Sequence, residues 1–294
     1  MPWPIVTPFR MRPNLEKLDP VAPALLLRDE LADVYRRERE RVIAAHPERA
    51  MVGSADVRAV NEIVTLAELS PLPQRGRARE GELCAPTNLL LQQPAPTPTL
   101  PRWGRAQDLA LKLQEDFVIL KHHEDTLRTE YLSVCFPSRW DPREKLGLDF
   151  ASIHAPVADN QMLQAAGPNI MTMAFMKQPM LRHVWLIVPA ASLDQHPEKN
   201  QAWWSEALAD PSPLLPRLFF RVERQTTWPL PHLQRAVFFI RLMMSPLVAV
   251  LNAMPGRPAE LAASLRSMTP AIVAYRGMTE ALPRLLNELD AMNV

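Results

Sequence analysis

One of the seven histidines in this chain stands in a setting that suits a cofactor or metal ligand. His154 is bracketed by the apolar residues Ile153 and Val157, and Pro156 stiffens the backbone two positions further on. A neutral imidazole is the commonest protein ligand of haem iron and of transition metals. Taken alone, the pattern is more typical of a core histidine, so it identifies a candidate ligand and does not choose a metal.

The other histidines are weaker candidates. His46 and His196 each precede a proline among polar residues, and we expect both to be exposed. His122 and His123 are adjacent in a predicted hairpin turn, where neighbouring side chains point to opposite faces and cannot both bind one ion. We therefore expect a solvated turn at these two positions.

A polar run, Arg-Val-Glu-Arg-Gln-Thr at 221–226, falls within a predicted strand. Because side chains alternate along a strand, Arg221, Glu223 and Gln225 share one face and Arg224 lies on the other. Such a face indicates either an edge strand with internal ion pairs or the polar wall of a pocket. In the second case an arginine would pair with a carboxylate through its planar guanidinium.

Cys135 and His154 would together supply a nucleophile and a base for covalent hydrolysis. Cys135 follows an apolar, β-rich run, and no nearby residues in the sequence mark an electropositive pocket. A buried thiol in apolar surroundings is inert, and we favour this interpretation.

Composition limits the class of protein. The 294 residues predict one large domain with additions or two small domains. Because 33 Lys and Arg stand against 32 Asp and Glu, no global field favours nucleic acid as a partner. The two cysteines form no CxxC pair, the chain has no apolar span long enough for a bilayer, and its N-terminus lacks a signal-peptide core. We therefore expect a cytoplasmic protein that does not bind membranes.

Hydrophobic periodicity predicts helices and strands in an α+β arrangement. The expected helices are 25–45, 56–69, 107–116, 162–176, 258–268 and 279–292. The expected strands are 117–120, 130–136, 184–188, 218–227 and 236–243, and the first two suit an antiparallel hairpin. Residues 1–105 would form a helical region with a proline-rich excursion at 71–101, and residues 106–294 would form a domain that carries the sheet.

Glycine motifs for nucleotides are absent. None of the 8 glycines forms a GxGxxG or GxxxxGK pattern, so we expect neither a dinucleotide site nor a P-loop on this polypeptide. If the protein performs redox chemistry, its electrons would come from a separate protein.

Several segments together resemble the alpha subunit of haem-dependent oxidative N-demethylase. The eight matching signatures are Gln114-Glu115-Asp116, 134–140 (VCFPSRW), Lys145-Leu146-Gly147, 153–157 (IHAPV), Arg182 with Trp185, 222–226 (VERQT), Phe239-Ile240-Arg241 and Tyr275-Arg276-Gly277. Any one of them is weak, but their order and approximate spacing also agree. The resemblance covers nearly the whole chain.

The resemblance implies a PAS-like antiparallel sheet with flanking helices and with helical additions at both termini. Residues 106–294 would then be a PAS-like haem-binding domain with C-terminal helices. A haem b would be bound without covalent attachment, with His154 as the axial ligand to iron. The resemblance also implies that Arg182, Arg221 and Trp185 bind the cofactor.

The similar enzymes oxidise a small secondary amine with dioxygen and outside electrons, and they release the methyl carbon as formaldehyde. By resemblance, Arg224, Gln225 and Glu223 would be the catalytic residues here. A separate flavin and iron-sulfur reductase would supply the electrons, and the oligomeric state stays open.

The chain departs from the family's usual residues at Ala158, Val184 and Trp228, which would change the walls of a substrate pocket. The substrate is therefore best described broadly, as a small amine or a related nitrogen-containing metabolite. Two alternatives remain: a PAS-like haem-binding or gas-sensing protein without turnover, and a haem-free interaction subunit with His154 in the core.

Overall fold

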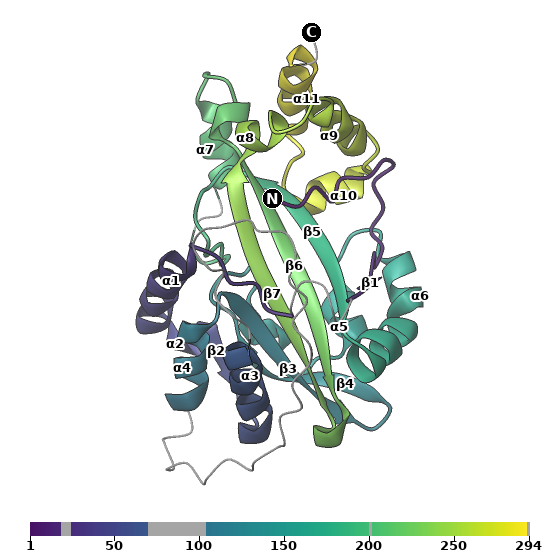
Figure 1. The fold of residues 1–294 in the computed structure, drawn as a ribbon. Helices are drawn as coiled ribbons and strands as arrows, with labels where there is room; N and C mark the ends of the chain where they lie inside the picture. Colours follow the sequence, from purple (N-terminus) through teal and green to yellow (C-terminus); the bar gives the residue numbers. More distant parts are fainter. Residues whose placement is uncertain (19–24, 70–103, 200–201, 293–294) are drawn as a thin grey trace, which may run out of the picture.

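A single antiparallel sheet of seven strands organises the computed structural model, which describes residues 1–18, 25–69, 104–199 and 202–292 (Figure 1). The strand order is β1-β5-β6-β7-β3-β4-β2. Helices pack on both sides of this sheet, so the predicted α+β class is confirmed. The predicted proline-rich excursion at 71–101 lies outside the described residues.

The strands are β1 (Glu16–Lys17), β2 (Met51–Gly53), β3 (Glu115–His123), β4 (Thr126–Ser133), β5 (Met180–Val188), β6 (Phe219–Leu230) and β7 (Arg235–Pro246). The expected hairpin at 117–136 is confirmed as β3 and β4. β5 begins four residues before the expected strand, because the polar pair Arg182 and His183 hides its start in the sequence while both residues pair with β6.

The helices are α1 (Ala32–Ala45), α2 (Pro47–Ala50), α3 (Val57–Leu69), α4 (Gly104–Lys112), α5 (Phe150–His154), α6 (Gln161–Ile170), α7 (Trp203–Ala209), α8 (Leu247–Leu251), α9 (Arg257–Arg266), α10 (Pro270–Tyr275) and α11 (Leu282–Ala291). A π-helical segment, Met171–Lys177, continues α6, and short 3-10 turns span Pro142–Lys145, Leu215–Arg217 and Pro231–Leu233. No helix in the described part of the chain is long and apolar enough to cross a membrane.

Two expected helices have different bounds. The helix expected at 25–45 starts at residue 32, because side chains of the sheet bind the backbone before it: Leu27 N–H donates to Glu115 Oε1 at 2.8 Å and Asp29 N–H to Gln114 Oε1 at 2.9 Å. The helix expected at 107–116 ends at Lys112, and Glu115 and the residue after it already belong to β3.

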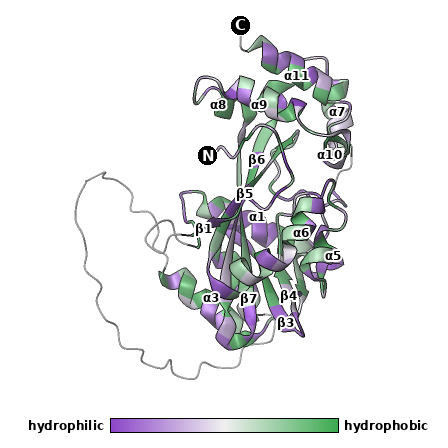
Figure 2. Cartoon of the chain, turned by 90° about the vertical axis from the view of Figure 1, so that its right-hand side faces the viewer, coloured by the Kyte–Doolittle hydropathy of each residue, from purple (hydrophilic) through white to green (hydrophobic). Residues whose placement is uncertain are grey.

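The two faces of the sheet have different covers, as the alternation of β3 shows. Phe117 and Ile119 pack with α3 and α4, whereas Val118 and Leu120 pack with α6 and the π-helical segment. We call these the α3 face and the α6 face; Figure 2 shows α3 on one side of the strands and α5 and α6 on the other. Beyond α3 and α4, the C-terminal helices α8 to α11 cover the upper part of the α3 face over β5 and β6 (Figure 1).

A buried ion pair ties α1 to the sheet. Arg39 Nη1 donates to Asp116 Oδ1 at 2.6 Å, and both side chains are almost fully buried. The same carboxylate accepts the backbone N–H groups of Cys135 and Phe136 at 2.9 and 3.0 Å. Strands β1 and β2 lie before residue 105 and pair with β5 and β4, so described parts of the N-terminal region join the sheet.

Candidate functional site

Strand register decides which of the expected site residues lie together. In β6 the side chains of Arg221, Glu223 and Gln225 alternate onto the α6 face, as the sequence predicted. In β5 the residue opposite Gln225 is Arg182, which therefore shares this face. The remaining two, Trp185 and Arg224, lie on the α3 face.

His154 ends α5 and keeps one ring nitrogen unoccupied. Its Nδ1 lies 2.8 Å from the carbonyl oxygen of Phe150, and a ring nitrogen facing a carbonyl must carry the proton. Nε2 then keeps its lone pair, and none of the described residues forms a hydrogen bond with it. The imidazole is half-buried and lies against the Phe150 ring, with 4.1 Å between ring centroids.

The surroundings of His154 hold the ring neutral. Burial lowers its pKa to about 4, and the positive charges of Arg182 and Lys145 act in the same direction. The hydrogen bond to Phe150 opposes this shift without cancelling it. At neutral pH the residue is therefore an uncharged base with a lone pair on Nε2, which is the form of histidine that can bind a metal.

Arg182 has no counterion inside the described part of the chain. Its guanidinium forms no hydrogen bond or ion pair there, and it interacts only through space with Glu223 and His154. The side chain is half-buried, and burial lowers its pKa. A desolvated cation without a partner is costly, so this guanidinium is suited to pair with an anionic group other than the described residues.

Glu223 is held by neutral donors and forms no ion pair with a described residue. Ser138 Oγ donates to Glu223 Oε1, and Gln225 Nε2 donates to Glu223 Oε2 at 2.7 Å. Tyr275, on α10, is close enough for the carboxylate charge to act on its phenol, whose pKa is raised chiefly by burial. Ser138 and Gln225 thus orient the Glu223 carboxylate within the α6 face.

The guanidinium of Arg221 makes its hydrogen bonds within the fold. It is fully buried, and burial lowers its pKa to about 10. Nε donates to Ser138 Oγ at 2.8 Å, Nη1 to the carbonyl of Leu193 at 2.9 Å, and Nη2 to that of Phe136 at 2.9 Å. These contacts join two loops to β6 and leave little of the guanidinium free for a ligand.

Trp185 and Arg224 lie on the opposite side of the sheet from His154. The Trp185 ring packs edge-on against Phe9, with 5.8 Å between centroids, and Arg276 stacks on it at 4.6 Å. Arg224 Nη1 donates to the carbonyl of Leu25 at 3.2 Å. In this arrangement both residues hold the N-terminal segment and the C-terminal helices.

Three other expectations, for His196, His46 and Cys135, can be compared with the structure. His196 is buried, with 1% of its surface exposed, so the expectation of exposure was wrong; Glu198 N–H donates to its Nδ1, and its Nε2 faces Asp141 at 3.4 Å. His46 is only partly exposed, with 45% of its side-chain surface accessible. Burial raises the pKa of the Cys135 thiol to about 12, which agrees with an inert cysteine.

The three positions at which we expected the chain to depart from the family's usual residues lie in different places. Val184 lies opposite Glu223 in the β5–β6 register and shares the α6 face with it. Trp228 packs in the cluster under α3 and α4, and Ala158 packs against the cluster of the C-terminal helices. Of these three positions, Val184 is the one that adjoins the candidate site.

Sequence reasoning missed Ser138 as an individual site residue, although it stands inside the 134–140 signature. The residue is remote from β6 in sequence, and only the folded loop brings its hydroxyl between Arg221 and Glu223. No group of three or more His, Cys, Asp or Glu side chains that would hold a metal ion occurs among the residues that the structure describes.

The fold and the site define an α+β protein with a neutral histidine and an unpaired guanidinium turned toward the same region. Residues 34–286 match the family model described as "Haem-dependent oxidative N-demethylase, alpha subunit-like". The match spans most of the chain, and the chain belongs to this family. The resemblance inferred from the sequence signatures is thus confirmed. No curated protein was found to match the chain.

Proposed function

We propose that this chain binds haem b in a PAS-like domain and uses it for the oxidative N-demethylation of a small amine. The observation that carries the proposal is the state of His154, a neutral imidazole with Nδ1 satisfied by Phe150 and Nε2 unbonded. A histidine that donates Nδ1–H to a backbone carbonyl is held in the tautomer and orientation that a metal ligand requires.

The residues around His154 suit the rest of a haem. The unpaired guanidinium of Arg182 would pair with a propionate, since Arg221 already uses its donors within the fold. Apolar surface for the macrocycle is present on the neighbouring α6 and π-helical segment, where Met162, Met173 and Met176 are exposed. A π-helical turn in an α-helix frequently marks a functional site.

The haem would supply the oxidising centre, with dioxygen as oxidant and electrons from a separate flavin and iron-sulfur reductase. Glu223 and Gln225 would position the amine, because an oriented carboxylate without an ion-pair partner suits a protonated amine. Val184 opposite Glu223 adds an apolar wall, which favours an amine with a hydrocarbon substituent.

Reconstitution tests the proposal. The purified chain should take up one equivalent of haem with a Soret band, and the loaded protein with a surrogate reductase should convert a secondary amine into formaldehyde. Glu223→Gln should keep the haem spectrum and lower kcat/KM, whereas Glu62→Gln on the exposed surface serves as the matched control. A folded chain that takes up no haem would contradict the proposal.

A further inference from the structure

A small cavity lies beside Ser138, at the edge of β5. Its volume is about 20 Å³, and its polar lining comes from Ser138, Arg139, Gln195 and Arg276. A water molecule needs roughly 10–15 Å³ of such volume and two to four polar partners. The cavity therefore has the size and the lining for one water.

Gln195 supplies an acceptor that nothing in the described part of the chain uses. The residue is 1% exposed, and its Nε2 donates to the carbonyls of Ser192 at 3.2 Å and Ala190 at 3.4 Å. Its Oε1 is buried and has no hydrogen-bond partner among the described residues. Leaving such an atom unpaired costs about 1–3 kcal/mol, which a water donating to it would offset.

Ser138 stands between this cavity and Glu223. A hydroxyl has one proton and two lone pairs. Ser138 gives the proton to Glu223 Oε1 and accepts Arg221 Nε–H with one lone pair, at 2.8 Å. The second lone pair is left to accept a hydrogen bond from a water in the cavity.

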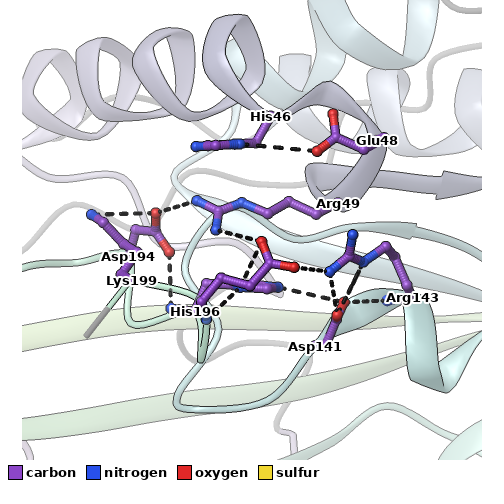
Figure 3. A network of polar contacts seen from close by, with 9 residues as sticks. His46, Glu48, Arg49, Asp141, Arg143, Asp194, His196 and Lys199 are labelled. Carbon is purple, nitrogen blue, oxygen red and sulfur yellow. Dashed lines mark hydrogen bonds and ion pairs between the residues drawn. The ribbon is translucent and has the colours of Figure 1, made fainter. Parts of the chain in front are cut away.

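The loops that carry Ser138 and Gln195 are held rigidly together. Arg139 N–H donates to the carbonyl of Gln195 at 3.0 Å, and the two loops form a parallel bridge at Ser138. Beyond the bridge lies the polar network of Figure 3, in which Asp141 faces His196 and Arg49 pairs with Asp194 at 2.9 Å. The bridge and this network together connect the loops that carry Ser138 and Gln195.

We propose that the cavity binds one water molecule and that this water, Ser138 and Glu223 form a proton path from solvent to the α6 face. The Ser138 hydroxyl proton passes to Glu223 Oε1 while Ser138 takes a proton from the water, and the water is reprotonated by solvent. Arg139 and Arg276 line the cavity, and their charges keep an excess proton from resting on the water. Glu223 Oε1 is the acceptor at the end of the path.

The purpose of the proton path rests on the proposed function, because the reduction of dioxygen would consume protons beside the haem. Whether the path exists does not depend on that function, since every group in the path belongs to the chain or to solvent. Tests of the path can therefore be made with or without haem.

A high-resolution crystal structure tests the water site. We expect an ordered water within hydrogen-bond distance of Gln195 Oε1 and Ser138 Oγ, and we expect its loss in Gln195→Leu, which keeps the side-chain volume and removes the acceptor. A wild-type cavity without an ordered water would overturn the water site.

A pH jump followed by infrared spectroscopy tests the relay, with Glu223→Gln identifying the carboxyl band. In Ser138→Ala the protonation of Glu223 should slow by on the order of 10²-fold, while Ser138→Thr, which keeps a hydroxyl, should retain the wild-type rate. Equal rates in the alanine variant would overturn the relay. If the wild-type chain binds no haem, the proposed function fails, and these two measurements still decide the path.

Discussion

Two arginines of this protein, the buried Arg39 and the half-buried Arg182, differ in their partners. Arg39, at the junction of α1 with the sheet, pairs with Asp116 at 2.6 Å, donates to the carbonyl of Gln114 at 3.1 Å and stacks on the Phe136 ring. Arg182, on the α6 face, has no hydrogen bond or ion pair within the described part of the chain. The fold supplies a counterion and hydrogen-bond acceptors to Arg39, whereas the described residues supply none to Arg182.

The difference teaches where to look for a ligand. A buried charge is tolerated when partners compensate the loss of hydration, and the fold supplies them for Arg39. The carboxylate that acts on Arg182 through space, that of Glu223, is held by Ser138 and Gln225 and forms no ion pair with it. An anionic ligand such as a haem propionate would therefore act as the counterion of Arg182, as Asp116 does for Arg39.

The largest expected effect is a loss of stability when the ion pair between Arg39 and Asp116 is broken. Arg39→Leu leaves the Asp116 carboxylate buried without a cation, so the free energy of unfolding should fall by about 3–5 kcal/mol. Urea denaturation followed by circular dichroism measures the loss. A decrease below about 1 kcal/mol would mean that the backbone N–H groups of Cys135 and Phe136 satisfy Asp116 without Arg39.

The next effect is a pH dependence of stability caused by His154. Its pKa is about 4 in the folded chain against 6.5 for an unperturbed histidine, so the unfolded state binds more protons between these values. Stability of the haem-free chain should therefore be complete above pH 6.5 and fall toward pH 4, by on the order of 3 kcal/mol. His154→Gln should flatten this part of the profile, and an unchanged slope would contradict the buried, neutral imidazole.

Arg182→Met should separate binding from stability. Removal of an uncompensated charge should leave the haem-free chain as stable as wild type, while the loss of one charge-assisted contact should weaken haem binding by about 1.5–3 kcal/mol. Thermal unfolding and haem titration measure the two quantities. A strongly destabilised haem-free protein with normal haem affinity would mean that Arg182, like Arg39, stabilises the fold and does not bind the ligand.

The smallest effect is expected at the surface of α1. Arg36 pairs with Glu40 at 2.7 Å, and both side chains are close to half exposed. Exposed pairs of this kind contribute about 0.3–0.5 kcal/mol. Arg36→Leu is thus the matched control for Arg39→Leu, and a loss above about 1 kcal/mol would show that position on α1, not pairing, governs the result.

Part of this comparison was predictable from the sequence. The alternation at 221–226 placed Arg221, Glu223 and Gln225 on one face because strand geometry is a local property. The charged residues on either side of Arg39 in α1 gave no sign that its side chain is buried. That burial depends on Asp116, which lies 77 residues away.

The remaining misses have the same cause. His196 looked exposed beside a proline, and its burial against Asp141 arises from contact between two loops. The division of the cofactor candidates between two faces followed only from the pairing of β5 with β6, which fixed Arg182 beside Gln225 and turned Trp185 away. Partners distant in sequence decide both cases, and a single sequence does not specify them.

The absorption spectrum of haem bound to His154→Ala tests the central claim most directly. We predict that the folded variant binds haem more weakly, with a shifted Soret band, and that added imidazole restores the wild-type spectrum by replacing the missing ligand. An unaltered spectrum and affinity in His154→Ala would show that another residue ligates the iron and would contradict the account.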